Sequence, residues 1–352
     1  MSAADGRGEP IADRELANLF QNLSNYRRIL IAVSGGPDSI ALLWLAARWR
    51  GNFKSGPMLI AVTVDHRLRK ESKQEAALVA KLARKLKIPH RILIWSGKKP
   101  NTRIQEVARD ARYRLLIDLA REINATAIVT AHTREDQAET VLHRIARGSG
   151  LSGLAGIRAK TERDGIAILR PLLGVAKAQL VATLCKARVP FADDPTNRDS
   201  RFLRPRLRQL APMLAEEGID AARLVLLANR LARANAAIET MVDEELGRVT
   251  RTLSDGYVKY DARTLFALPS EISLRLLGRA IDRYGYEGPV ELGKLEALHE
   301  AIAKAWAANL HLKRTLAGAL VNLDAVGLDI SPAPLRRNAR RGHPRRFVQG
   351  IR

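Results

Sequence analysis

The sequence has almost no cysteine, since Cys185 is the only one in 352 residues. A disulfide scaffold, a structural zinc cluster and a CxxC redox pair each need at least two thiols, so all three are excluded. Enzymes that transfer sulfur to a substrate through paired cysteines are excluded for the same reason.

Long hydrophobic runs are also missing. The most apolar stretch, residues 29–47, is interrupted by Gly35, Gly36, Pro37 and Asp38, which a membrane span would not keep. The first twenty residues carry four acids and no apolar segment of the kind found in secretory signals. We therefore expect a cytoplasmic protein with no membrane partner.

Acidic residues are scarce relative to basic ones, with 37 Asp and Glu against 59 Lys and Arg, for a net charge of +22. Such an excess indicates a polyanionic partner, and nucleic acid is the first candidate. Residues 331–352 contain seven arginines and no acid, which predicts a disordered, polycationic tail.

Strand-like and helical runs alternate from residue 28 to about 130. We expect buried strands at 29–33, 58–64, 91–95 and 126–130, and helices at 39–49, 71–87 and 102–123, the last opened by Thr102 and Gln105 in capping-box spacing. Alternation of this kind predicts an α/β fold, with a doubly wound, mostly parallel sheet that binds ligands at the carboxyl ends of its strands.

The composition changes after about residue 214. A long amphipathic helix over 220–248, helices near 262–284 and 291–308, and strand-like pieces at 310–330 predict a second, smaller, mainly helical domain. The expected organisation is an N-terminal extension (1–24), an α/β domain (25–214), a helical domain (215–330) and the basic tail (331–352).

The most specific motif follows the first strand and consists of Ser34, Gly35, Gly36, Pro37, Asp38 and Ser39. Glycines let the backbone approach an anion, and the N–H groups that open the next helix supply partial positive charge. No Gly-Lys-Ser/Thr follows, so this is not a Walker loop. Asp38 would repel a bare pyrophosphate, which implies Mg²⁺ or a contact elsewhere on the nucleotide. The alternative is a tight turn that simply needs glycine.

Two further groups lie on neighbouring elements. Asp65 and His66 end the second strand, where an acid suits a ribose or adenine edge, although a solvated turn is the alternative. Arg109 and Arg112 share a helical face beside Tyr113. Arg112 is suited to holding ATP or the leaving pyrophosphate, and an ordinary basic face is the alternative.

The fourth strand leads into a polar helical face formed by His132, Asp136, Glu139 and His143. A metal site and a surface stripe are the alternatives to a catalytic cluster. Residues 147–154 are rich in glycine and predict a mobile loop, or only a helix cap with a linker. Further on, four arginines predict an anion site or an RNA-backbone contact: Arg201, Arg204, Arg206 and Arg208.

In combination, the motifs SGGPDS, VDHRLR, TAH…DQAET…RGSGLSGL and DDPTN…RPRLR resemble the tRNA(Ile)-lysidine synthetase family of the PP-loop (N-type) ATP pyrophosphatases, over about residues 28–212. The resemblance, to a shorter form of the family, implies that ATP adenylates C2 of the wobble cytidine in the CAU anticodon of tRNA(Ile). The amine of free L-lysine then displaces AMP. The lysidine product reads AUA instead of AUG.

The resemblance also implies roles by position. Residues 34–39, with Asp65 and His66, would bind ATP, and Asp38 would lie near Mg²⁺. Arg112 would be the catalytic arginine, and His132, Asp136 and Glu139 the central polar cluster. Asp136 and Glu139 are suited to the ammonium groups of lysine, and Arg204 and Arg208 match the arginines of the family's RNxxR motif.

Three positions depart from the family pattern. Thr133 replaces a second His, Glu135 replaces Asp, and Pro205 replaces the Asn of RNxxR. The alternatives are another PP-loop ligase, tRNA-modifying or amide-forming, and a non-catalytic RNA-binding protein with a vestigial nucleotide fold. The sequence leaves open the general base and whether the chain forms a homodimer.

Overall fold

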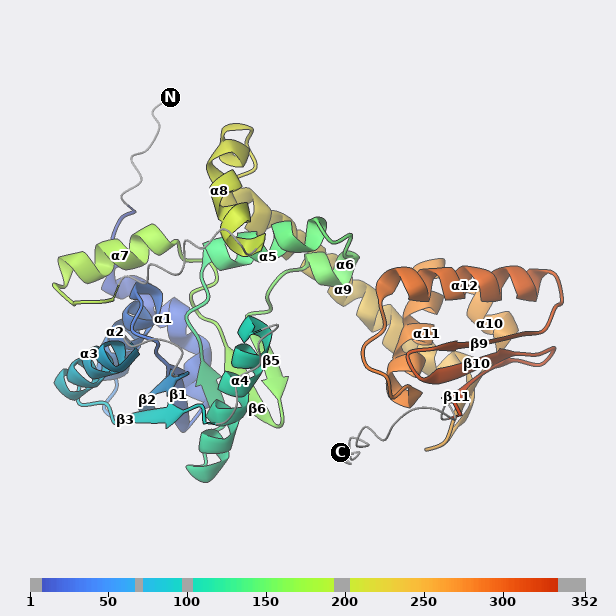
Figure 1. Ribbon diagram of the computed structural model, residues 1–352, viewed down its shortest axis with the longest axis horizontal. Coiled ribbons are helices and arrows are strands. Elements are labelled where there is room, and N and C mark those ends of the chain that lie inside the picture. Colours follow the sequence, from blue (N-terminus) through green and yellow to red (C-terminus); the bar gives the residue numbers. More distant parts are fainter. Residues whose placement is uncertain (1–7, 67–71, 97–103, 193–202, 335–352) are drawn as a thin grey trace. The chain divides into compact units, whose positions relative to one another are not determined.

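The computed structural model describes residues 8–66, 72–96, 104–192 and 203–334, with 104–106 and 203–208 described by their backbone alone. These residues form two compact units, one up to Ala232 and one from Arg233 onward (Figure 1). The division falls inside a single long helix, whereas the domain boundary expected from the sequence is residue 214.

The first unit is built on a six-stranded sheet with the order β3-β2-β1-β4-β6-β5. All neighbouring strands are parallel except β5 and β6, which are antiparallel. The strands are β1 (Arg28–Ala32), β2 (Met58–Asp65), β3 (His90–Ile94), β4 (Ala127–Val129), β5 (Lys160–Arg163) and β6 (Ile166–Leu169). The mostly parallel α/β fold predicted from the sequence is confirmed.

Helices connect these strands and cover both faces of the sheet (Figure 1). They are α1 (Asp13–Phe20), the 3-10 helix η1 (Gln21–Asn25), α2 (Pro37–Gly51), α3 (Ser72–Lys85), α4 (Ile104–Glu122), α5 (Arg134–Ile145), α6 (Leu151–Leu154) and α7 (Lys177–Lys186). Two later helices, α8 (Leu203–Glu216) and the start of α9 (Ala221–Val249), pack against α5. The capping box expected at Thr102 lies outside the described residues.

Strand β1 shows why two helical layers form. Successive side chains of a strand point to opposite faces of the sheet, so an apolar run such as Arg28–Ala32 needs cover on both sides. Ile29 and Ile31 are fully buried in the core that contains α2, and Leu30 is fully buried in the core that contains α4.

The segment before β1 is part of the first core. Ile11, Leu16, Phe20 and Leu23 are all buried there, and the ring centres of Phe20 and Trp49 lie 5.8 Å apart. The N–H of Ile11 donates to Oγ1 of Thr183, at 2.9 Å. The residues expected to form an N-terminal extension therefore pack into the α/β unit from Ile11 onward.

The second unit combines helices with an antiparallel sheet of order β7-β8-β11-β10-β9. Its elements after α9 are β7 (Thr250–Leu253), β8 (Val258–Tyr260), α10 (Ala262–Ala267), α11 (Ser270–Tyr284), α12 (Leu292–Ala307), β9 (Leu312–Leu316), β10 (Ala319–Leu323) and β11 (Leu328–Pro332). β7 and β8 were not anticipated, and β11 includes Ser331 and Pro332, which pair with β10 instead of starting the expected tail.

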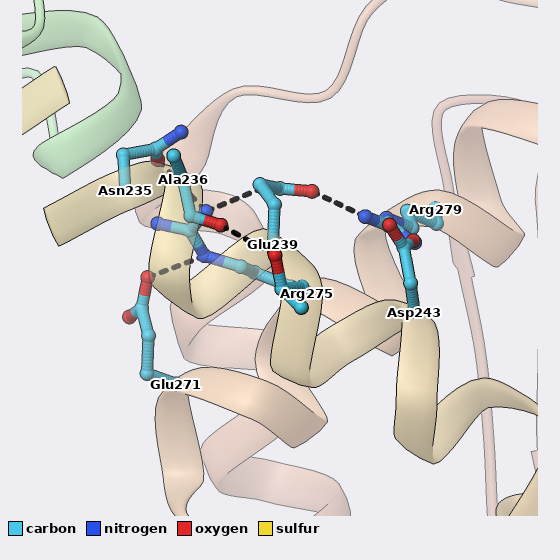
Figure 2. A network of polar contacts seen from close by, with 8 residues as sticks. Asn235, Ala236, Glu239, Asp243, Glu271, Arg275 and Arg279 are labelled. Carbon is cyan, nitrogen blue, oxygen red and sulfur yellow. Dashed lines mark hydrogen bonds and ion pairs between the residues drawn. The ribbon is translucent and has the colours of Figure 1, made fainter. Parts of the chain in front are cut away.

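Ion pairs join α9 to α11 within the second unit (Figure 2). Arg275 contacts Glu239 and also donates to Asn235 and Glu271, at 2.8 and 2.7 Å. Arg279 contacts Glu239 and Asp243. Because only 12% of the Arg275 side chain is exposed, this network is less screened than a typical surface pair. It fixes the second half of α9 to α11.

In the part of the chain that the structure describes, no helix combines the length and apolar character that crossing a membrane would require.

Candidate active site

The predicted site residues gather at one edge of the six-stranded sheet. Ser34, Asp65, Thr130 and Arg170 each lie at or just after the carboxyl end of β1, β2, β4 and β6, which are neighbours in the sheet. The chain crosses over between β1 and β4, because β1 pairs with β2 on one side and with β4 on the other. Ligands of doubly wound folds bind at such a switch point.

The loop after β1 is held by its own serines. The N–H of Ser34 donates to Oγ of Ser39 at 3.1 Å, and that hydroxyl donates to the carbonyl of Gly36 at 3.0 Å. Pro37 occupies the first position of α2, where a missing N–H costs nothing. The remaining N–H groups of the first turn have no acceptor within the helix, so they are available to donate to an anion.

Gly35 is required by this loop. Its φ angle is +96°, a left-handed conformation that side chains disfavour. A Cβ added there would lie 3.0 Å from Cβ of Glu75 on α3. The carbonyl of Gly35 accepts a hydrogen bond from the N–H of Ala192, at 3.0 Å, which ties the loop to the end of the segment after α7.

Asp38 and Asp136 share one ammonium group. Nζ of Lys177 lies 3.0 Å from Oδ1 of Asp136 and 3.5 Å from Oδ2 of Asp38. Lys177 opens α7, and its side chain is about one third exposed. Lys177 was not predicted from the sequence, although a lysine at the start of a helix that follows a sheet strand is a detectable signal.

The positive charge near Asp38 does not offset the cost of burying its carboxylate. Burial is the main factor that raises its pKa, to about 6, with Asp136 and Glu135 acting in the same direction and Lys177 opposing them. Its Oδ1 is buried and has no hydrogen-bond partner among the described residues. This oxygen fits a magnesium ion, which proteins commonly bind through one or two carboxylates together with substrate phosphates. Among the same residues, no cluster of three or more His, Cys, Asp or Glu forms a metal site of protein ligands alone.

Asp136 belongs to the N-terminal cap of α5. Its Oδ2 accepts from the N–H and the hydroxyl of Thr133, at 2.9 and 3.0 Å, and Thr133 Oγ1 accepts from the Asp136 N–H. Burial alone would raise the pKa of Asp136, but Lys177 and the Thr133 N–H outweigh it and lower the pKa below its usual value. Asp136 is therefore ionised at neutral pH.

Two of the departures from the family pattern have structural roles here. Thr133 is fully buried and caps α5. Oε2 of Glu135 accepts from the backbone N–H of Lys177, at 3.0 Å, so Glu135 fixes the start of α7 against α5. The third, Pro205, lies in the first turn of α8, where a backbone N–H has no acceptor within the helix.

His132 is a neutral imidazole. Burial first, and then the charges of Arg170, Arg109 and Arg112, lower its pKa to about 3, against the opposing effect of Asp136. Its Nδ1 lies 2.9 Å from Oγ1 of Thr130. Glu139 follows Asp136 by three residues on α5 and is half-buried on the same face of the helix.

Arg112 and Arg170 supply positive charge at this edge. Burial and the charge of Arg109 lower the pKa of the half-buried Arg112. Arg170 is buried, and its Nη1 donates to the carbonyl of Arg158 and to Oγ1 of Thr161, at 2.8 and 3.1 Å. Arg170 was also not predicted, although a charged residue directly after a buried strand marks the ligand-binding edge of a parallel sheet.

Asp65 and His66 lie where they were expected, at the end of β2. Asp65 is buried, and its carbonyl accepts from the N–H of Trp95 beyond β3, at 2.9 Å. The rings of His66 and Trp95 meet edge to face, with centres 5.6 Å apart. The end of β2 thus carries an acid and an aromatic pair next to the loop after β1.

The glycine-rich segment after α5 is held more firmly than a mobile loop would be. The N–H of Ile157 donates to Gln137 Oε1 at 2.5 Å, and Arg144 donates to the carbonyl of Gly156 at 2.8 Å. Gly156 has a φ angle of +73° and passes so close to Gln137 that a Cβ would collide with it. Part of the segment forms α6.

The four predicted arginines after residue 200 are only partly described. Arg204, Arg206 and Arg208 lie on α8, but their side chains are outside the described part of the structure, as is the whole of Arg201. The segment 193–197 also lies outside it.

Comparisons with known proteins cover most of the chain. Residues 9–214 match the family model of the PP-loop domain. The tRNA(Ile)-lysidine synthase of Rhodopseudomonas palustris is 52% identical over 337 residues, which cover 94% of this chain and 97% of that protein. That of Bradyrhizobium sp. is 53% identical over 349 residues, or 95% and 97% of the two chains.

A solved structure shows the same fold. A tRNA thiolase from Methanococcus maripaludis matches with a TM-score of 0.54 and 15% identity, over 62% of this chain and 77% of that one. At this identity the likeness concerns the fold alone.

Proposed function

Since the chain belongs to the tRNA(Ile)-lysidine synthase family, we propose that it ligates L-lysine to C2 of the wobble cytidine in the CAU anticodon of tRNA(Ile), at the expense of ATP. The cytidine O2 attacks the α-phosphorus of ATP, and pyrophosphate leaves. The amine of lysine then attacks C2, AMP leaves, and the amine loses a proton. The tRNA changes from reading AUG to reading AUA.

In the first step, residues 34–39 hold the phosphates of ATP. The N–H groups at the start of α2 face negative charge, and the Ser34 and Ser39 hydroxyls order the loop before ATP arrives, which limits the entropy lost on binding. Asp65 and His66 contact the nucleoside. Arg112 stabilises the charge that develops on the transferred phosphate.

Asp38 would hold Mg²⁺ through its buried Oδ1, which has no partner among the described residues. When bound, the ion neutralises phosphate charge and favours the departure of pyrophosphate. The raised pKa of Asp38 falls when a cation takes this place, so nucleotide binding with the metal removes the energetic penalty of the buried carboxylate.

In the second step, Asp136 and Glu139 bind the ammonium groups of lysine. Asp136 is ionised, and its carboxylate already accepts one ammonium group, that of Lys177 at 3.0 Å, which supports this role. His132 is neutral at pH 7, so it acts as a hydrogen-bond partner of the cytidine rather than as a cation. A neutral amino acid would bring no positive charge to Asp136 and Glu139, which is the basis for selecting lysine.

The observation that carries this proposal is that Lys177 contacts both Asp38, in the motif after β1, and Asp136 on α5. ATP and lysine need neighbouring sites, and these two acids lie in the two proposed sites. The test is pyrophosphate release from ATP by the purified protein, with and without tRNA. We expect release with a CAU-anticodon tRNA(Ile) and none with a CAU-anticodon methionine tRNA. Equal release with both would contradict the assignment. We place the reaction in the cytoplasm, where free lysine, ATP and tRNA are all present.

A further inference from the structure

Three arginines surround one tyrosine beside the candidate active site. The guanidinium carbons of Arg109 and Arg112 on α4 and of Arg163 on β5 lie 5.3, 5.5 and 5.9 Å from the centre of the Tyr113 ring. We call these four residues the Tyr113 cluster. Attraction to a single ring offsets only part of the repulsion among three cations.

Acids do little to neutralise this cluster. Within the described residues, the acid paired with it is Asp110, whose Oδ1 lies 3.5 Å from Arg163 and whose side chain is 66% exposed. A pair so exposed is strongly screened. The neighbouring acid Glu162 points to the opposite face of the sheet, because side chains alternate along β5. Three guanidiniums against one carboxylate leave an excess of two positive charges.

Two buried polar groups nearby have unused hydrogen-bonding capacity. The hydroxyl of Tyr113, which is 4% exposed, has no partner among the described residues, and neither has Nε of Arg170, which is 7% exposed. The described acceptors of Arg170 are neutral, the Arg158 carbonyl and the Thr161 hydroxyl. A buried cation that faces only neutral groups is costly, and an anionic ligand would relieve that cost.

The positive groups extend away from the active site along β5. Thr161 and Arg163 lie on the same face of this strand, and Thr161 contacts Arg170 at the active-site end of β6. Arg163 instead pairs with Ile166, at the opposite end of β6. Arg170 lies four residues beyond Ile166, so the charges are spread over about 13 Å of the sheet, at roughly 3.3 Å per residue. A chain of phosphates fits such a row better than a single pyrophosphate does.

We propose that the Tyr113 cluster, through Arg109 and Arg163 and together with Arg170, binds phosphodiester groups of the tRNA strand that carries the wobble cytidine, which leaves Arg112 for the transferred phosphate. Guanidinium groups match the oxygens of phosphate in planar, bidentate pairs. Because phosphodiesters carry no sequence information, the cluster orients the anticodon strand rather than reading it. The inference rests on the proposed function, since it takes tRNA as the substrate.

The test uses Arg163, which lies outside the proposed catalytic groups. The Kd of the full-length chain for unmodified CAU-anticodon tRNA(Ile) is measured over a series of salt concentrations for the wild type, Arg163→Gln and Arg163→Lys. The matched control is Arg114→Gln. Arg114 is exposed on α4, the helix that carries Arg112, but it lies on a different face of that helix. The KM for ATP is measured in parallel at saturating tRNA.

We expect Arg163→Gln to weaken binding about threefold at low salt and to reduce the slope of log K against log salt by about 0.7–0.9, the value for one lost phosphate contact. Arg163→Lys should restore the slope, and Arg114→Gln and the KM for ATP should not change. An unrelated tRNA should show the same effect of Arg163→Gln, so the result does not depend on lysine ligation.

Three outcomes would overturn the inference. A raised KM for ATP with unchanged tRNA binding would assign the phosphate to the nucleotide. A lower Tm with an unchanged slope would show that Arg163 only packs on the tyrosine ring. Equal losses in Arg163→Gln and Arg163→Lys would show that charge is not the cause. If the wild-type protein itself does not bind tRNA, the result counts against the proposed function rather than against this inference.

Discussion

Replacing Asp38 by Asn should inactivate the enzyme and stabilise the ligand-free protein. Folding raises the pKa of Asp38 from 3.8 to about 6, mainly through burial. A pKa that changes by one pH unit corresponds to about 1.4 kcal/mol, so the ionised carboxylate destabilises the native state by about 2–3 kcal/mol well above pH 6. Asn has nearly the same size as Asp but carries no charge, so the variant lacks this destabilisation.

The sign of the effect depends on pH. Well below pH 3.8 the Asp38 carboxyl is protonated in both folded and unfolded states, and the variant should match the wild type. Between pH 3.8 and about 6 the unfolded state loses this proton while the folded state keeps it, so the wild type loses stability, and the advantage of Asp38→Asn should grow over this range and level off above about pH 6. For a unit of this size the gain corresponds to about 5–10 °C in Tm.

Asp136→Asn is the matched control, because the pKa of Asp136 is lowered by folding. A carboxyl with a lowered pKa contributes stability above its unfolded pKa of 3.8 and loses it as the pH falls. Asp136→Asn should therefore be less stable than the wild type from pH 8 down to about pH 4, and the difference should shrink only as the pH falls below 3.8. Thermal unfolding without ATP or Mg²⁺, from pH 4 to 8, measures both variants. Equal signs for the two variants, or an Asp38→Asn effect independent of pH, would refute the reasoning.

Four further substitutions test other parts of the structure. Gly35→Ala should cost about 1–2 kcal/mol through its positive φ and weaken ATP binding, as measured by Tm and calorimetry; unchanged affinity would contradict the role of the loop. Thr133→Ala should lower stability by about 1 kcal/mol by removing the α5 cap, whereas Thr133→Ser should not. Lys177→Met should lower Tm at pH 8 and lower it less at pH 4, where Asp38 takes up a proton and one of the two facing charges is lost; a loss independent of pH would show that only packing changed. Arg275→Met should cost about 1–2 kcal/mol and speed hydrogen exchange in α11 but not in α2; equal changes in both helices would contradict a local effect.

The sequence predicted the central strands β1, β2 and β4 well because they are buried on both faces. The edge strand β3 was also expected to be buried, but it is largely exposed. Continuous apolar runs, such as those of β1 and β2, can be recognised without knowledge of their neighbours. β7 and β8 were missed for the opposite reason. β7, Thr250–Leu253, is largely exposed and follows a long helix without a turn signal, and it becomes a strand through pairing with β8, which itself depends on the distant β11.

The candidate site was predicted only where its chemistry follows the chain locally. The serines and glycines of residues 34–39 and the start of α5 are contiguous, and their spacing is readable. Lys177 and Arg170 join the site through contacts between segments 9 to 139 residues apart, which no local pattern contains. The pKa of Asp38 is likewise set by burial and by neighbours from α5 and α7.

The most direct test of the central claim is the incorporation of labelled lysine into tRNA. The purified chain, with ATP and Mg²⁺, should transfer about one lysine per molecule of unmodified tRNA(Ile) with a CAU anticodon, releasing one AMP and one pyrophosphate. It should transfer none to a methionine tRNA with the same anticodon, and Asp38→Asn should transfer none to either. Failure of the folded wild-type protein to label tRNA(Ile) would contradict the account.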